Sequence, residues 1–300
     1  GARIHQAGCN GCIGMGQAPA TGKISLRTVP RNFPGRSGTK DDQVYLCSPE
    51  TAAASALNGV ITDPRTLDMP YPEYADPEHL RINAEMLVAP PESGESVRLE
   101  KGPNIKPLPE FDPLPETLSG PVLLKLGDNI STDEIMPAGA RVLPFRSNIP
   151  EISKFVYTQV DPEFPERALA FQKKGFIIVA GNNYGQGSSR EHAAIAPRHL
   201  GLRLVIAKSF ARIHWQNLIN FGMLPLTFVN AADHNSISQQ DVLEIDDLRT
   251  AVSGTGRITV HNRTQQTSFY AAHALSHRQI DMVLQGSYIN VVRQRQPQAE

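Results

Sequence analysis

The sequence predicts an α/β fold, because apolar runs typical of buried strands alternate with segments typical of helices. Residues 175–180 contain no polar side chain and show no alternation, as expected of a buried strand. A glycine-rich turn follows, and residues 191–199 have the composition of a helix. The same order recurs in residues 202–207, an apolar run, and residues 211–220, a second expected helix. Alternation of this kind is typical of α/β domains.

A proline-rich stretch separates two folded parts of the chain. Residues 63–115 contain many prolines and few periodic apolar runs, which indicates an extended segment with one short helix over residues 77–86. Compact domains rarely contain so long a loop, so a domain boundary is expected inside it. We therefore expect a first domain over residues 1–80, a linker over residues 81–118 and a second domain over residues 119–300.

The other expected elements follow from capping residues and short apolar runs. Ser48 precedes the alanine-rich residues 51–57 and is a typical N-cap, so a helix is expected there that ends near Gly59. His214 is expected to be structural and to hold loops in place. The remaining expected elements are strands over residues 122–126, 242–245 and 257–260, and a helix over residues 277–284.

The bulk composition excludes several classes of protein. The formal net charge is −1, so the chain has no general attraction for nucleic acid or an anionic membrane. No apolar stretch approaches the length needed to span a bilayer. Only three cysteines are present, which argues against a disulfide scaffold and for a reducing compartment such as the cytoplasm.

The junction between the apolar run and the first helix is the strongest candidate site. Gly181, Gly185 and Gly187 open the turn, and a helix start leaves backbone N–H groups unpaired where the dipole favours an anion. Ser188 and Arg190 fall at the same point, so the junction suits a carboxylate and a buried serine alkoxide. The alternative is that Ser188 is only an N-cap and Arg190 only a solvated residue.

Two other segments carry residues suited to binding. The pair Cys9 and Cys12 has the spacing of a zinc site, an iron–sulfur site or a redox couple, although zinc would need two further ligands. Arg31 and Arg36 lie in a loop rich in proline and glycine, and their forked donors suit bidentate recognition of a carboxylate. Two solvated surface arginines are the alternative.

The chain resembles the aconitase family in several long motifs. Two of them are Tyr184-Gly-Gln-Gly-Ser-Ser-Arg-Glu-His-Ala-Ala and Pro197-Arg-His-Leu-Gly, which are similar to the active-site segment of the aconitase swivel domain. The others are Ser209-Phe-Ala-Arg-Ile-His, Asn217-Leu-Ile-Asn-Phe-Gly-Met-Leu-Pro-Leu, Pro30-Arg-Asn-Phe-Pro-Gly-Arg and Gly8-Cys-Asn-Gly-Cys. The resemblance implies a partial three-layer α/β domain that bears a cluster, an extended linker and a swivelling β/β/α domain.

The resemblance also assigns roles to residues of this chain. Ser188 would be the catalytic base, and Asp133 would hydrogen-bond nearby active-site groups. Cys9 and Cys12 would be two of the three cysteine ligands of a [4Fe–4S] cluster, the third lying upstream of this sequence. The residues that would bind the substrate are Arg31, Arg36, Arg146, Ser189 and Arg190.

The function implied is that of an aconitate hydratase, which isomerises citrate and isocitrate through cis-aconitate in the tricarboxylic acid cycle. The chain is expected to be the C-terminal part of a longer enzyme or one subunit of a split enzyme, and to be inactive without the missing N-terminal domains. Its expected location is the cytoplasm, or the mitochondrial matrix in a eukaryote.

Two alternatives stay open. Homoaconitases and isopropylmalate isomerases resemble Gly-Cys-Gly-Ser-Ser-Arg-Glu-His, whereas this chain has Gln186 at the cysteine position, which favours citrate. Some aconitase relatives bind messenger RNA when the cluster is lost, but the even charge balance argues against this role here.

Overall fold

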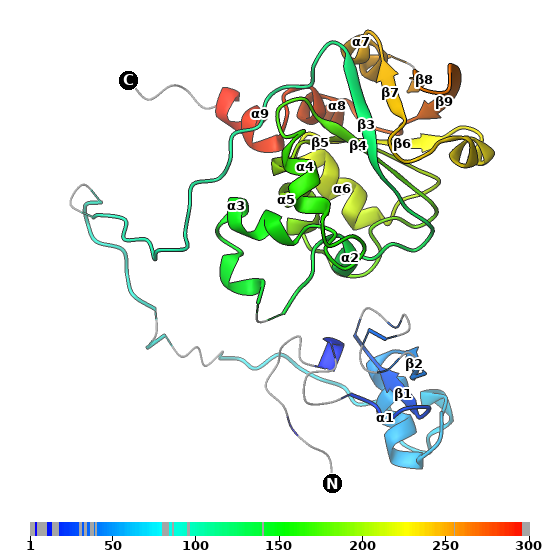
Figure 1. Ribbon diagram of the computed structural model, residues 1–300. Coiled ribbons are helices and arrows are strands. Elements are labelled where there is room, and N and C mark those ends of the chain that lie inside the picture. The colour runs from blue at the N-terminus through cyan, green and yellow to red at the C-terminus, as the bar shows by residue number, and fades with distance from the viewer. Residues whose placement is uncertain are drawn as a thin grey trace. The chain divides into compact units, whose positions relative to one another are not determined.

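The computed structural model describes two compact units, residues 1–99 and residues 100–300. The described residues are 11–13, 18–29, 41–79, 87–94, 97–139, 141–254 and 256–295, with residues 4, 32, 35, 36, 39, 84 and 85. The division between the units falls inside the predicted linker (Figure 1).

Unit 1 is built on two short parallel strands and one helix. Strands β1 (Ile24–Arg27) and β2 (Gln43–Leu46) pair in parallel, and the helices are α1 (Pro49–Asn58), η1 (Gly11–Ile13) and η2 (Pro64–Thr66). The predicted helix cap is confirmed, since Ser48 accepts a hydrogen bond from the Thr51 N–H at 3.1 Å. Parallel strands are normally covered on both faces, yet Ile24 and Tyr45 are 61% and 48% exposed. Unit 1 therefore leaves apolar surface uncovered.

The segment between the units contains neither a helix nor a strand in its described residues from 67 to 117. The short helix expected over residues 77–86 is absent from residues 77–79, 84 and 85. Residues 80–83 and 86 lie outside the described part of the chain. The prediction of an extended segment therefore agrees with the structure, whereas the helix receives no support.

Unit 2 contains a closed barrel in the strand order β3-β4-β5-β6-β9-β8-β7. Strands β3 to β6 pair in parallel, and every other neighbouring pair is antiparallel. The strands are β3 (Leu118–Lys125), β4 (Phe176–Ala180), β5 (Leu202–Ala207), β6 (Leu224–Phe228), β7 (Val242–Ile245), β8 (Arg257–Asn262) and β9 (Thr267–Ala272). The predicted α/β class is confirmed, with a barrel as its sheet.

Short helices complete unit 2. They are α2 (Thr132–Ile135), α3 (Ile149–Ile152), α4 (Phe164–Leu169), α5 (His192–His199), α6 (Arg212–Asn220), α7 (Leu248–Ser253), α8 (His277–Leu284) and α9 (Tyr288–Arg295), with 3-10 turns η3 (Leu143–Phe145), η4 (Ser153–Phe155) and η5 (Ala231–Ser236). The helices expected near α5, α6 and α8 are confirmed to within one residue. None of the helices in the described residues has the length and apolar character needed to cross a membrane.

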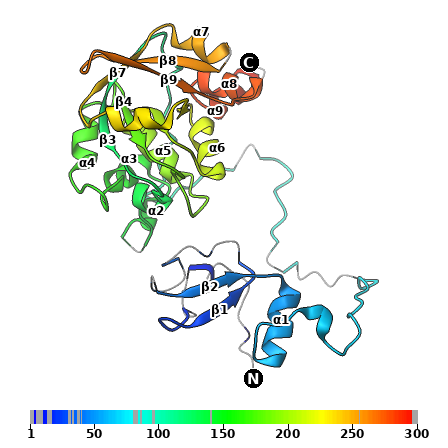
Figure 2. The same ribbon diagram turned by 90° about the vertical axis from the view of Figure 1, so that its right-hand side faces the viewer.

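The core of unit 2 has two parts because the parallel strands are buried on both faces. Along β4, Ile177 and Val179 join a cluster with residues from all seven strands, which fills the barrel. Phe176 and Ile178 point the other way, into a cluster with residues of α3, α4 and α5. Figures 1 and 2 show these helices on one side of unit 2 and strands β7 to β9 on the other. Burial on both faces therefore explains why β4 is apolar along its whole length.

Replacing Gly222 by alanine should lower the free energy of unfolding by about 3 kcal/mol or more. Its φ of +69° is left-handed, and an added Cβ would lie 1.9 Å from the carbonyl oxygen of Gly286. Gly127→Ala is the matched control, because its Cβ would meet no atom within 4 Å. Urea unfolding followed by circular dichroism measures both, and a loss below about 1 kcal/mol for Gly222→Ala would contradict this close approach.

Candidate active site

Two loops meet where the parallel strands β3 and β4 end. The loop after β3, residues 126–131, and the loop after β4, residues 181–191, are joined by backbone hydrogen bonds. The N–H of Gly181 donates to the Gly127 carbonyl at 3.0 Å, and the N–H of Gly185 donates to the Ile130 carbonyl at 2.8 Å. Ligands of α/β proteins commonly bind outside the carboxyl ends of parallel strands. The two loops therefore form the candidate site.

Gly181 allows the two loops to come this close. A Cβ on Gly181 would lie 2.0 Å from Oδ1 of Asp128. The Asp128 carboxylate instead accepts the backbone N–H of Asn182 at 2.7 Å and its side-chain amide at 3.2 Å. Both bonds lower the pKa of Asp128, and the bond from the backbone N–H has the larger effect. Sequence reasoning missed Asp128, although an acidic residue directly after a strand is a recognisable signal.

Ser188 lies in the loop and is not the N-cap of a helix. Helix α5 begins at His192 and its cap residue is Glu191, which makes no side-chain capping bond, so the alternative that Ser188 is an N-cap is wrong. The backbone of Ser188 is held by the buried hydroxyl of Thr132 instead. The Ser188 N–H donates to Thr132 Oγ1 at 3.1 Å, and that hydroxyl donates to the Ser188 carbonyl at 3.1 Å. Ser188 is half-buried, and Ser189 beside it is exposed.

Arg190 is anchored on helix α2 and is not a solvated side chain. Its Nη1 lies 2.9 Å from Oδ1 of Asp133 and donates to the carbonyls of Thr132 and Met136 at 3.2 and 2.5 Å. The side chain of Arg190 is only 17% exposed. These bonds all start from Nη1, so within the described part of the chain the other N–H groups of the guanidinium are left uncommitted. The predicted proximity of Asp133 to the site residues thus agrees with the structure.

Helix α2 owes its short, well-defined start to a capping box. The N–H of Glu134 donates to Ser131 Oγ at 3.2 Å, while Glu134 Oε2 accepts the Ser131 N–H at 2.7 Å. Such reciprocal bonds satisfy donors that a helix start leaves open. Because α2 carries Thr132 and Asp133, the capping box also fixes the partners of Ser188 and Arg190.

Arg146 is tied to the site through its backbone. It follows the 3-10 turn η3 and is exposed, and its carbonyl accepts a hydrogen bond from Nε2 of His192 at 2.7 Å. A carbonyl only accepts, so this nitrogen of His192 carries the proton. The bond fixes the segment of Arg146 against the start of α5. Unit 2 thus brings together Asp133, Arg146, Ser188, Ser189 and Arg190.

The buried support of the loop is His214 on α6. Its ring is 1% exposed and stands edge-on to the ring of Tyr184, with centroids 5.2 Å apart. A Cβ on Gly185 would lie 2.2 Å from Cδ2 of His214. Neither ring nitrogen has a hydrogen-bond partner within the described residues, and burial lowers the pKa of His214 to about 3. His214 therefore supports the loop as a neutral ring, which agrees with its expected structural role.

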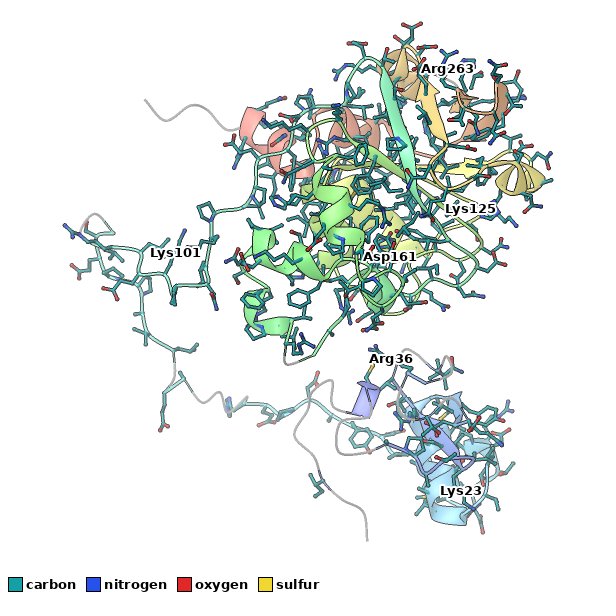
Figure 3. All side chains as sticks on the ribbon, viewed as in Figure 1. Lys23, Arg36, Lys101, Lys125, Asp161 and Arg263 are labelled. Atoms are coloured by element: carbon teal, nitrogen blue, oxygen red, sulfur yellow. The ribbon has the colours of Figure 1, made fainter. Side chains whose placement is uncertain are left out.

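In unit 1, Arg36 contacts one of the predicted cluster ligands. Nη2 of Arg36, labelled in Figure 3, lies 3.4 Å from Sγ of the buried Cys12. Cysteine sulfurs bind the iron of iron–sulfur clusters, and hydrogen bonds to those sulfurs are among the features that tune such clusters. Cys12 therefore fits a cluster ligand chemically. Cys9 and Arg31 lie outside the described residues, and the described side chains form no group of three or more potential metal ligands.

Thr132→Val should lower the free energy of unfolding by about 1–3 kcal/mol, because the N–H and carbonyl of Ser188 lose their common partner. Valine keeps the shape of threonine and removes the hydroxyl. Thr132→Ser retains the hydroxyl and should lower the free energy of unfolding by less than Thr132→Val does. Urea unfolding compares the two variants, and equal losses would show that the hydroxyl contributes nothing.

His214 should make the protein sensitive to acid. The folded state keeps the ring neutral down to about pH 3, whereas the unfolded chain takes up a proton near pH 6.5. Stability from this group is complete above pH 6.5 and is lost as the pH falls toward 3, by up to about 1.4 kcal/mol per pH unit. His214→Gln should show a shallower loss over that range in urea unfolding, and an unchanged slope would contradict the assignment.

Two family models match segments of this chain. The aconitase C-terminal domain family matches residues 145–231, and the aconitase family (aconitate hydratase) matches residues 1–59. A mitochondrial aconitate hydratase of Gracilaria gracilis is 29% identical over 98% of this chain and 43% of its own length. A mitochondrial homoaconitase of Debaryomyces hansenii is 36% identical over 75% of this chain and 31% of its own.

A mitochondrial homocitrate dehydratase of Saccharomyces cerevisiae is 29% identical over 97% of this chain and 44% of its own length. Among solved structures, 3-isopropylmalate dehydratase (leuD) of Methanocaldococcus jannaschii matches with a TM-score of 0.49 and 30% identity, over 60% of this chain and 95% of its own. This chain thus spans less than half the length of the curated relatives. With both family matches on the segments that carry the motifs, the chain belongs to the aconitase family.

Proposed function

We propose that this chain is the C-terminal part of an aconitate hydratase, a hydro-lyase that interconverts citrate and isocitrate through cis-aconitate. The observation that carries the proposal is the placement of Ser188, whose backbone is fixed by Thr132 beside the anchored guanidinium of Arg190. Unit 2 would be the swivel domain of such an enzyme. Unit 1 would be the end of the domain that bears the cluster.

The reaction begins with the removal of a weakly acidic carbon-bound proton, and Ser188 Oγ is the proposed base. A serine can act in this way only where its alkoxide is stabilised by donors and positive charge. Arg190 supplies that charge two residues along the same loop, and Asp133 keeps its guanidinium in place. The proton would move from the substrate carbon to Ser188 Oγ and return from it in the hydration step.

The tricarboxylate substrate needs several cations, because its three carboxylates are all ionised near neutral pH. Arg31, Arg36, Arg146 and Arg190 are proposed to bind them, and the exposed hydroxyl of Ser189 adds a donor. Forked guanidinium groups suit this task, since each can hold one carboxylate by two hydrogen bonds. The arginines would also stabilise the charge that develops on the intermediate after proton removal.

Cys9 and Cys12 are proposed to supply two ligands of a [4Fe–4S] cluster, with a third from the remainder of the enzyme. When bound, the cluster supplies a Lewis acid for the leaving hydroxyl group. The contact of Arg36 with Sγ of the buried Cys12 supports this role, because hydrogen bonds to the cysteine sulfurs tune iron–sulfur clusters.

The missing N-terminal domains are the proposed partner of unit 1. Its parallel strands and the exposed side chains of Leu57, Tyr71 and Tyr74 need covering surface that the described residues do not supply. The relatives reported above are named as mitochondrial proteins, which supports the mitochondrial matrix as the location in a eukaryotic source.

A second candidate is a homoaconitase or isopropylmalate isomerase. The 36% identity to a homoaconitase favours it, whereas Gln186 favours citrate. An assay of aconitate absorbance on the intact protein that contains this chain, after anaerobic reconstitution with iron, decides between them. Citrate, homocitrate and isopropylmalate are compared as substrates. Turnover of citrate alone supports the first proposal, and preference for either homologue overturns it.

Ser188→Ala in the intact protein should reduce turnover by about 100- to 10,000-fold while leaving substrate binding nearly unchanged. The substitution removes the proposed base and retains the backbone bonds to Thr132. Ser268→Ala, on strand β9, is the control and should retain wild-type rates. Turnover of Ser188→Ala within threefold of wild type would refute the assignment of the base.

A further inference from the structure

The side chain of Gln186 makes one hydrogen bond within its own loop and one to the other loop of the site. Its Oε1 accepts a hydrogen bond from Nδ2 of Asn183 at 2.9 Å, and its Nε2 donates to the Asn129 carbonyl at 2.7 Å. Nδ2 of Asn183 also donates to Oδ1 of Asn129 at 3.1 Å. We call these three residues the amide brace. Within it, Oε1 and Nε2 of Gln186 each bond to protein.

The backbone conformations show why the brace is needed. Asn129 and Asn183 have φ values of 60° and 56°, in the left-handed region that costs free energy for a residue with a side chain. One left-handed residue lies in each loop, and their side chains bond to each other. The brace thus stabilises two unfavourable conformations at once.

The position of Gln186 links the brace to Ser188. The backbone N–H of Gln186 donates to the Ile130 carbonyl at 3.1 Å, and its carbonyl accepts the N–H of Thr132 at 2.8 Å. Thr132 in turn holds the backbone of Ser188. A change in the spacing of the loops at Gln186 is therefore passed to Ser188 through one residue.

We propose that Gln186 is a positioning residue, which sets substrate choice through the spacing of the two loops and does not contact the substrate. The proposal rests on the function proposed above. A cysteine side chain ends one atom beyond Cβ and cannot reach both asparagines. Loss of the brace lets the loops separate and admits a differently shaped substrate.

Amide hydrogen exchange on the 300-residue chain tests the brace without any assay of activity. Gln186→Ala and Gln186→Cys remove both side-chain bonds, so the amides of Thr132 and Ser188 should exchange about tenfold faster or more. The exchange rate of the Ile206 amide in β5 should be unchanged in both variants. Gln239→Ala, at an exposed glutamine, is the control. Exchange at Thr132 and Ser188 within twofold of wild type overturns the proposal.

Gln186→Glu adds a dependence on pH that a loss of packing alone would not show. A carboxylate at this position accepts from Asn183 but repels the Asn129 carbonyl, whereas a protonated carboxyl group restores the donor. Protection of the Ser188 amide, corrected for intrinsic exchange, should be near wild type at pH 4 and reduced at pH 7. If protection of the Ser188 amide is reduced equally at both pH values, the proposal is overturned.

Kinetics of the intact protein separate positioning from substrate contact. Gln186→Cys should lower kcat for citrate and narrow the preference for citrate over isopropylmalate. An increase in KM alone, with wild-type exchange at Ser188, would mean that Gln186 touches the substrate and would overturn the proposal. If exchange responds as expected and the wild-type protein does not turn over citrate, the proposed function fails while the role of the brace is retained.

Discussion

The candidate site depends on one constraint, the backbone pairing of the loop after β3 with the loop after β4. Glycine at position 181 permits the approach, because any Cβ there would overlap the Asp128 carboxylate. The bonds that follow join main-chain amides to main-chain carbonyls, so few of them can be altered by a change of rotamer. The position of Ser188 is consequently set by the register of two neighbouring strands, which is fixed by a buried barrel.

The barrel explains why these loops can be irregular without being loose. Strand β4 is buried along its whole length, between the barrel interior and helices α3 to α5. Opposite burial of successive side chains prevents a shift of register, because a slip of one residue would exchange the two faces. The left-handed residues Asn129 and Asn183 are stabilised on this rigid base by bonds between their side chains. Strain of this kind persists only where the surroundings determine the conformation.

The sequence predicts those parts of the fold that local pattern controls. Strands β4 and β5 were predictable because burial on both faces requires a continuous apolar run. Strand β9 was missed, since Ser268 and Tyr270 are exposed and break up its apolar pattern, and α9 was missed because its sequence is polar. In the site, the motif supplies Ser188 and Arg190. The bonding partners of Thr132 and Asp128 could not be predicted, because they lie 56 and 54 positions away in the sequence.

The bonding of Ser188 and Arg190 explains how the site can be prepared before a substrate arrives. Within the described part of the chain, the hydrogen bonds of Ser188 are made by its backbone, so Oγ remains available for proton transfer. Nη1 of Arg190 is bonded to Asp133 and to the carbonyls of Thr132 and Met136, so the guanidinium is already oriented before a substrate arrives. Because these groups are held in place by partly buried bonds, they need little rearrangement when negative charge develops. Donors that are already oriented stabilise such charge most effectively.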